Sequence, residues 1–245
     1  MGQVPKNKTK IPYLIIGNGR LATHFGHYFK QLSVMYLHWW RGCEKDLQSQ
    51  MLQVDKILVL INDDAIENFI QARRIPNKSQ VWIHCSGALT THLADSAHPL
   101  MTFSDTFYDM ETYRNILFVT ESGRASFTEL FPELPNPHTS IPSNRKGFYH
   151  AWCSMAGNFT TILWQEFFTR LEQEFKISRQ MTYPYLNQIT KNLQQASSPL
   201  TGPLARGEIN SLKIHQDNLI DDDFRRIYQA FVDVFLSRQK MGDRV

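Results

Sequence analysis

Two glycines near the start of the chain have the spacing of a backbone site for phosphate groups. Gly17 and Gly19 follow the apolar run 14–16, and Ala22 stands three residues after Gly19. In this G-x-G-x-x-G/A pattern a strand turns tightly into a helix, whose free N–H groups and positive dipole end favour a pyrophosphate. A glycine turn that only links two elements is the alternative. The predicted dinucleotide contacts in the turn are Gly17, Asn18, Gly19, Arg20 and Leu21.

The end of the second expected strand carries a base where such turns are normally followed by an acid. The apolar stretch 34–38 comes one strand–helix–strand unit after the turn and leads into Trp40 and Arg41. An acid at this point binds the ribose 2′-hydroxyl of NAD, whereas an arginine favours a 2′-phosphate. We therefore predict NADP as the cofactor, with Arg41 as the main cation and Arg20 as a second one. Ordinary surface arginines are the alternative.

Two later apolar runs, 56–61 and 81–85, predict strands that are buried on both faces of a parallel sheet. In a doubly wound sheet the carboxyl end of the first borders the cofactor, so we expect Ile61 and Asn62 to line it. Capping of the next helix explains Asn62 equally well. The second run opens into Ser86, where the nicotinamide and the substrate are expected to meet.

Four polar side chains are candidates for catalysis. Ser86 ends the last of these strands, and His98 precedes a proline that restricts the backbone and so fixes the direction of the histidine. Farther along, His150, Ser154 and Asn158 recur every four residues, which places them on one face of a helix. We predict catalytic roles for Ser86, His98, His150 and Asn158. Structural histidines and a solvated helix face are the alternatives.

The hydrophobic periodicity changes from strands to helices near residue 145. A last strand is expected at 115–120, after which a proline-bearing segment and the polar stretch 143–147 break the pattern. From Phe148 to Phe175 apolar residues recur at helical spacing, as core or as a dimer surface. We predict an α/β fold, with an N-terminal Rossmann dinucleotide-binding sheet in residues 1–144 and an all-helical domain in residues 145–245. Further helices are expected around residues 181–196, 206–216 and 222–238.

A segment rich in glycine and proline, residues 197–208, separates two of these helices and is not compatible with a regular helix. It is either a structured connection or a loop that carries Thr201 and Arg206 toward a substrate carboxylate.

Composition limits the classes of protein that the chain can belong to. Its 245 residues are 42% hydrophobic and 20% charged, which is typical of a globular protein with one large or two ordinary domains. The net charge of +3 is scattered, so nucleic acid is not expected as a partner. We also expect no membrane segment, no secretory signal and no metal site, because the three cysteines are widely spaced and no apolar run is long enough. The cytoplasm is the expected location.

Several segments together resemble a known family. IIGNGRLATHF, HCSGA, HPLMTF, the helix with His150 and Asn158, and TGPLARGE resemble a bacterial Rossmann family of formerly unknown function, which is 6-phosphogluconate-dehydrogenase-like. Within that family the chain resembles the alternative ketopantoate reductases. The resemblance implies an NADP-binding domain, a helical domain that builds a homodimer and an active site between the two domains. The implied reaction is reduction of a small 2-oxo acid, in particular 2-dehydropantoate (ketopantoate) to pantoate in pantothenate biosynthesis.

One position departs from the wider group that the resemblance points to. That group presents a lysine four residues before an asparagine; Asn158 matches the asparagine, but Ser154 stands at the lysine position. Because the lysine would protonate the new alkoxide, another donor is needed here. The candidates are His98 and His150, with Lys146 or Lys191 less favoured.

In this scheme Asn158 and Ser86 orient the carbonyl, and Arg206 holds the carboxylate. The expected substrate contacts are Ser86, His98, Asn158, Thr201 and Arg206. Two other functions stay open: a reductase of imines or semialdehydes, which needs less help from an acid, and a non-catalytic protein that binds NADP(H).

Overall fold

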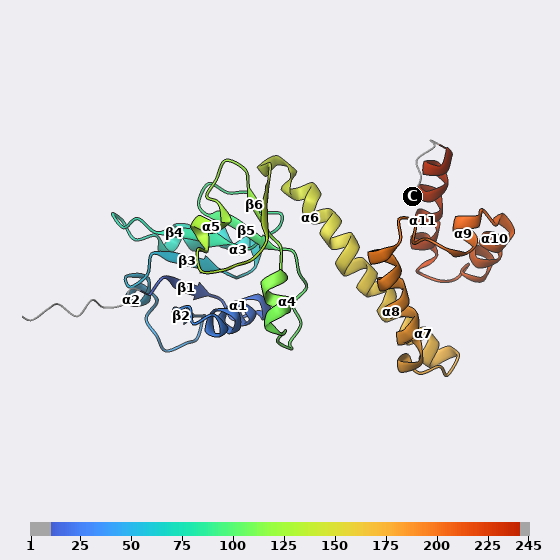
Figure 1. Ribbon diagram of the computed structural model, residues 1–245, viewed down its shortest axis with the longest axis horizontal. Helices are drawn as coiled ribbons and strands as arrows, with labels where there is room; N and C mark the ends of the chain where they lie inside the picture. Colours follow the sequence, from blue (N-terminus) through green and yellow to red (C-terminus); the bar gives the residue numbers. More distant parts are fainter. Residues whose placement is uncertain (1–10, 241–245) are drawn as a thin grey trace, which may run out of the picture. The chain divides into compact units, whose positions relative to one another are not determined.

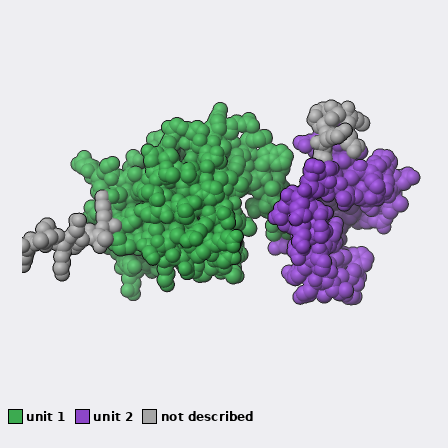
Figure 2. All heavy atoms as spheres, viewed as in Figure 1, with its two compact units in different colours: residues 1–163 green, residues 164–245 purple. Residues whose placement is uncertain are grey.

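The computed structural model describes residues 11–240, except for the side chains of residues 239 and 240, and the chain divides into two units, Met1–Leu163 and Trp164–Val245 (Figure 2). The first unit is built on a seven-stranded sheet, and the second is helical (Figure 1). The predicted α/β fold class, a Rossmann-like sheet followed by a helical region, is confirmed. The division into domains after residue 144 stays a prediction.

The strands lie in the order β2–β1–β3–β4–β5–β6–β7. Neighbouring strands from β2 to β5 are parallel, β6 is antiparallel to β5, and β7 is parallel to β6. Ile16 pairs with Trp39 on one side and with Val59 on the other, so the carboxyl ends of β1, β2 and β3 are level. The bounds are β1 (Tyr13–Ile16), β2 (Tyr36–Trp39), β3 (Lys56–Val59), β4 (Val81–His84), β5 (Asp95–Pro99), β6 (Phe118–Glu121) and β7 (His138–Ile141).

Helices cover both faces of the sheet, because successive residues of a buried strand point to opposite sides. Tyr13 and Ile15 of β1 pack with α1 (Arg20–Gln31), α4 (Met110–Asn115) and α5 (Phe127–Leu130). Leu14 and Ile16 pack with α2 (Leu47–Met51) and α3 (Asp63–Arg73) on the other side.

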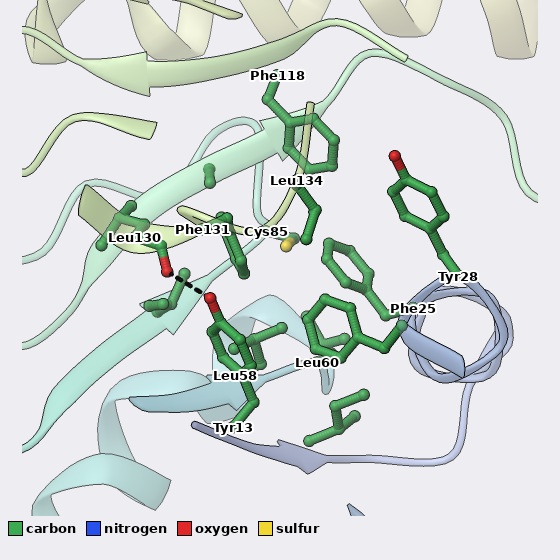
Figure 3. Close-up of a cluster of buried hydrophobic side chains, with 14 of the residues drawn as sticks. Tyr13, Phe25, Tyr28, Leu58, Leu60, Cys85, Phe118, Leu130, Phe131 and Leu134 are labelled. Carbon is green, nitrogen blue, oxygen red and sulfur yellow. Dashed lines mark hydrogen bonds between the residues drawn. The ribbon is translucent and has the colours of Figure 1, made fainter. Parts of the chain in front are cut away.

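The first of these cores is rich in aromatic rings (Figure 3). Phe25, Phe118 and Phe131 lie within about 6 Å of one another, as measured between ring centroids. The buried Tyr13 hydroxyl donates a hydrogen bond to the Leu130 carbonyl at 3.1 Å, which ties β1 to the end of α5.

All five predicted strands are present, as β1, β2, β3, β4 and β6, but β5 and β7 were not predicted. The segment 95–99 forms β5, so His98 lies within a strand and not in a loop after one. Propensity did not indicate this strand, because the DSAHP sequence is polar and short; pairing with both β4 and β6 stabilises it. β7 was also missed, and the strand expected at 115–120 begins only at Phe118 because Asn115 ends α4.

The helical part begins with a short 3-10 turn (Ser143–Arg145) and α6 (Lys146–Ser154). A π-helical segment, Met155–Phe159, joins α6 directly to α7. Within residues 11–240 no helix combines the length and apolar character needed to cross a membrane. The remaining helices are α7 (Thr160–Glu174), α8 (Arg179–Gln195), α9 (Gly202–Arg206), α10 (Ile209–Asn218) and α11 (Arg225–Lys240).

Helix α9 corrects the expectation that residues 197–208 contain no regular helix. Pro203 lies in its first turn, where a missing N–H costs nothing, and Gly207 follows its last residue with a φ of +68°. The helix-breaking residues Pro203 and Gly207 therefore mark the two ends of a short helix.

A buried ion pair fixes the start of α6 to the sheet. The Lys146 ammonium donates hydrogen bonds to Glu121 Oε1 at 3.0 Å, to Ser96 Oγ at 2.8 Å and to the Leu89 carbonyl, so all three of its N–H groups have acceptors. The two side chains are only 4% and 2% exposed. Burial opposes ionisation of Glu121, but hydrogen bonds from Ser143 and Lys146 outweigh it and hold the pKa of this carboxyl below its ordinary value.

Replacing Glu121 tests this anchor. Glu121→Gln leaves the Lys146 charge buried without a counterion, and we expect a loss of about 3 kcal/mol in the free energy of unfolding, measured by urea titration. Because the pKa of Glu121 is depressed in the folded protein, the loss is complete at neutral pH and shrinks as the pH falls through that pKa. A Glu121→Leu/Lys146→Met double variant is expected to recover most of the stability; a single variant as stable as the wild type contradicts the anchor.

Candidate functional site

A cleft of about 790 Å³ opens at the carboxyl ends of β1, β2 and β3. The chain order reverses between β1 and β3, and in open α/β sheets the crevice at such a point is where ligands bind. All eight of the predicted cofactor contacts line this cleft: Gly17, Asn18, Gly19, Arg20, Leu21, Arg41, Ile61 and Asn62.

The two positions of the turn, 17 and 19, need glycine for different physical reasons. Gly17 has a φ of +119°, and a Cβ atom there would lie 2.1 Å from the Leu60 carbonyl oxygen, so the backbones of the turn and of the residue after β3 are in direct contact. At Gly19, by contrast, no atom of the described residues other than Gly19 and its two chain neighbours lies within 4 Å of the position that a Cβ atom would take. Gly17 is thus needed by the fold, whereas the space at Gly19 is open to a ligand.

The start of α1 is suited to an anion. Gly19 begins the helix without a side chain to cap it, and the first turn contains no acid. Its first N–H groups are therefore available at the positive end of the helix dipole. Together with the open space at Gly19, these residues fit the pyrophosphate of a dinucleotide.

One end of the cleft has aromatic and cationic walls. Trp39 and Arg41 at the end of β2 lie on one side, and Phe69 and Arg73 of α3 line the same cleft. The Trp39 and Phe69 rings are 6.4 Å apart between centroids. This end fits an adenosine that carries a 2′-phosphate, since arginines pair well with phosphate.

The sequence analysis did not identify Arg73. Its signal is the spacing of Ala65, Phe69 and Arg73, which recur every four residues and line the cleft from one face of α3. Arg20 also lines the cleft, but its guanidinium donates to Asp105 at 2.8 Å, and both side chains are exposed. The Arg20 guanidinium that lines the cleft is therefore already paired with the Asp105 carboxylate.

Ser86 lies at the other end of the cleft and is held by several hydrogen bonds. Its hydroxyl donates to the Asp63 carboxylate and accepts from the Leu89 N–H at 2.9 Å and the Ala88 N–H at 3.3 Å. Asp63 is thus occupied by Ser86, and Asn62 begins α3 without a side-chain cap. These contacts fix the shape of the turn that follows β4.

Gly87, the residue after Ser86, is enclosed by two of the predicted catalytic histidines. A Cβ atom on Gly87 would lie 2.3 Å from Cδ2 of His150 and 3.0 Å from Cδ2 of His98. The two rings are perpendicular, with centroids 5.4 Å apart. The structure therefore brings His98 of β5 and His150 of α6 together at the turn that ends the cleft.

His98 is held in its neutral form. Burial, together with the nearby His150 and Lys146, lowers the pKa of His98 to about 4. Its Nδ1 lies 2.9 Å from the Tyr149 hydroxyl oxygen. At neutral pH His98 can donate a hydrogen bond, but it is not an imidazolium. Lys146, also considered as a proton donor, is occupied by Leu89, Ser96 and Glu121.

Asn158 lies in the π-helical segment, which interrupts the regular spacing assumed for His150, Ser154 and Asn158. The wider turn of a π-helix moves Asn158 away from the α-helical face. The Thr160 hydroxyl donates to the Ala156 carbonyl, and the Thr161 hydroxyl donates to the Gly157 carbonyl at 2.8 Å, so these side chains give hydrogen bonds to carbonyl groups of the π-helical segment. π-segments of this kind occur frequently at functional sites.

The three remaining candidates belong to the second unit. Thr201 begins α9, and the Arg206 guanidinium donates to Glu208 at 2.5 Å. Lys191 is an exposed residue of α8. The substrate contacts predicted for Thr201 and Arg206, and the role of Lys191 as a less favoured proton donor, stay predictions.

Solved structures share this arrangement of sheet and helices. A Bacteroides fragilis protein described provisionally as an NADP oxidoreductase is 17% identical, has a TM-score of 0.74, and is matched over 94% of this chain and 99% of that chain. Plasmodium falciparum pyrroline carboxylate reductase with NADP bound is 11% identical, has a TM-score of 0.59, and is matched over 94% of this chain and 97% of that chain. An Aspergillus terreus reductive aminase in complex with NADPH and ethyl levulinate is 11% identical, has a TM-score of 0.60, and is matched over 96% of this chain and 95% of that chain.

The chain therefore has the α/β fold that NADP(H)-dependent oxidoreductases also use. At these identities the likeness shows the fold alone. Residues 118–234, slightly less than half of the chain, match the family described as "Domain of unknown function (DUF2520)". No curated protein matches the chain.

The two glycines give a paired prediction. Gly19→Ala is expected to weaken NADPH binding about tenfold, or about 1.4 kcal/mol, with little change in thermal stability, because its methyl group points into ligand space. Gly17→Ala is expected to lower the free energy of unfolding by more than about 2 kcal/mol, because it adds a strained φ and an overlap with Leu60. Calorimetric titration and thermal unfolding of both variants check this; a Gly19→Ala protein that binds NADPH normally contradicts the pyrophosphate position.

Proposed function

We propose that this protein is an NADPH-dependent reductase of a small 2-oxo acid. The observation that carries the proposal is the continuity of one cleft. It begins at Arg41 and Arg73, passes the glycine turn and ends at Ser86, and Gly87, enclosed by two histidines, is the next residue. A dinucleotide that lies along it with its phosphates at the turn brings its nicotinamide end toward the histidines.

Different residues of the cleft would bind different parts of the cofactor. The N–H groups at the start of α1 would hold the pyrophosphate, and Arg41 and Arg73 would hold the 2′-phosphate. When bound, NADPH supplies a hydride to the substrate.

The reaction balances with one proton from the protein. The carbonyl carbon accepts the hydride, the π electrons of the C=O bond move to oxygen, and the oxygen takes a proton to give a 2-hydroxy acid and NADP⁺. Because His98 is neutral and Lys146 is occupied, we assign the proton to His150 and a hydrogen bond to the carbonyl oxygen to His98. Ser86 holds the turn that positions both rings.

We propose 2-dehydropantoate as the substrate, reduced to pantoate in the cytoplasm. In this assignment Asn158 orients the carbonyl, and Thr201 and Arg206 contact the carboxylate. Support comes from the segments that resemble the alternative ketopantoate reductases, including TGPLARGE, and from the π-segment at Asn158.

We further propose that the active form is a homodimer. Phe148, Trp152, Met155, Phe159 and Ile162 are large apolar residues on consecutive turns of helix from α6 through the π-segment into α7, and each is more than a third exposed. Exposed large apolar side chains that are gathered on one stretch of helix are typical of a surface that packs against another chain.

Turnover tests the proposed reaction. Purified protein is expected to oxidise NADPH when 2-dehydropantoate is added, and to do so faster than with NADH. A panel of other 2-oxo acids and cyclic imines serves as the control for substrate class. Turnover of imines alone makes the protein an imine reductase, and NADPH binding without turnover of any compound makes it a non-catalytic binding protein; both results overturn the proposal.

The arginines test the choice of cofactor. Arg41→Ala and Arg73→Ala are each expected to weaken NADPH binding about tenfold and to leave NADH binding nearly unchanged, because only NADPH carries the 2′-phosphate. Lys30→Ala, at the far end of α1, removes the same charge from an exposed position and is the matched control. If a variant weakens NADPH and NADH binding equally, the arginine concerned does not bind the 2′-phosphate.

The two histidines test the assignment of the proton. His150→Gln is expected to lower kcat by about 10²- to 10⁴-fold, and His98→Gln by a smaller factor, because a lost hydrogen bond costs less than a lost proton donor. His92→Gln, in an exposed position, is the control. The reverse order of the two effects contradicts the assignment.

A further inference from the structure

A tyrosine hydroxyl links His98 to a cysteine one turn farther along α6. The Tyr149 oxygen is 2.9 Å from Nδ1 of His98, and Tyr149 also hydrogen-bonds the Cys153 side chain. The Tyr149 and His98 rings meet edge to face, with centroids 5.5 Å apart and planes at 83°. One nitrogen of the candidate catalytic ring is therefore held by a residue that the sequence analysis did not single out.

The direction of this hydrogen bond follows from the chemistry of the three groups. A phenol has a single hydrogen to donate, an imidazole nitrogen is a good acceptor, and a thiol sulfur is a weak one. Burial and Cys153 raise the pKa of Tyr149, so the hydroxyl keeps its hydrogen at neutral pH. Since the phenol hydrogen goes to the better acceptor, the Tyr149 hydroxyl donates to His98 Nδ1.

We propose that Tyr149 is a positioning residue that holds His98 in the tautomer with its hydrogen on Nε2. From Nε2 the ring donates a hydrogen bond to the carbonyl oxygen of the substrate. The identity of that acceptor rests on the proposed function, whereas the tautomer does not depend on it.

The surroundings of His98 keep its ring in the neutral form, so protonation of the ring does not disturb the hydrogen bond with Tyr149. The ionisable groups around the ring are His150, Tyr149 and Lys146 of α6, and burial, together with the nearby His150 and Lys146, lowers the pKa of His98 to about 4, so the ring is neutral at ordinary pH. A neutral ring carries one hydrogen, so its position on Nδ1 or Nε2 is the quantity that Tyr149 controls.

The chain contains a matched control in a second tyrosine–histidine pair. The Tyr113 hydroxyl oxygen lies 2.6 Å from Nδ1 of the buried His24, and His24 Nε2 is 2.9 Å from the Ser104 carbonyl oxygen. Tyr113→Phe removes the same hydroxyl from a histidine that does not enclose Gly87.

The experiment is nitrogen NMR of the full-length protein labelled with ¹⁵N-histidine, with His98→Gln used to assign the His98 signals. In the wild type we expect the two-bond correlation pattern of an Nε2–H ring for His98. In Tyr149→Phe we expect a mixture of the two tautomers, and in Tyr113→Phe an unchanged His98 pattern. A wild-type His98 with its hydrogen on Nδ1, or a Tyr149→Phe spectrum like that of the wild type, overturns the proposal.

Kinetics then separate this proposal from the proposed function. Where 2-dehydropantoate is turned over, Tyr149→Phe is expected to lower kcat about tenfold with little change in KM, since the substrate is still bound but its carbonyl is less well oriented. A KM effect without a kcat effect contradicts the positioning role. If no 2-oxo acid is reduced, the proposed function fails, while the NMR result still decides the tautomer.

Discussion

A single buried ammonium group determines where the first helix of the helical half meets the sheet. Lys146 reaches from the start of α6 to Glu121 of β6, Ser96 of β5 and the Leu89 carbonyl beyond β4. A charge that is only 4% exposed is tolerated because each of its hydrogens has an acceptor and one acceptor is a carboxylate. Three elements that are distant in the sequence are thereby fixed at one point.

The candidate site depends on this point. Tyr149 and His150 follow Lys146 by three and four residues, so the anchor places them within the first turns of α6, beside His98 and Gly87. The cleft that ends at Ser86 is built separately, by contact of Gly17 with Leu60 at the reversal of strand order. The candidate dinucleotide cleft and the pair of histidines thus meet at one glycine, where a Cβ atom would lie 2.3 Å from the His150 ring and 3.0 Å from the His98 ring.

Local patterns in the sequence were enough to predict the sheet's first strands and the cleft, because the glycine turn and the apolar runs report directly on local structure. The histidine cluster was only partly predictable. His98 and His150 were proposed separately, but β5 is too polar to be recognised alone, and the partner of Tyr149 depends on how α6 packs on the sheet. Arg73 looks like an ordinary surface cation in the sequence, and Lys146 was considered there only as a less favoured proton donor; only the tertiary structure shows that Lys146 is buried in an ion pair and that Arg73 lines the cleft. The π-segment at Asn158 likewise has no reliable signal in its sequence, MAGNF.

The most direct test of the central claim is calorimetric titration of the wild-type protein with NADPH and, in parallel, with NADH. The cleft predicts one nucleotide per chain and an affinity for NADPH at least about tenfold higher than for NADH, because Arg41 and Arg73 can pair with the 2′-phosphate. Absence of NADPH binding, or equal affinities for the two nucleotides, contradicts the account.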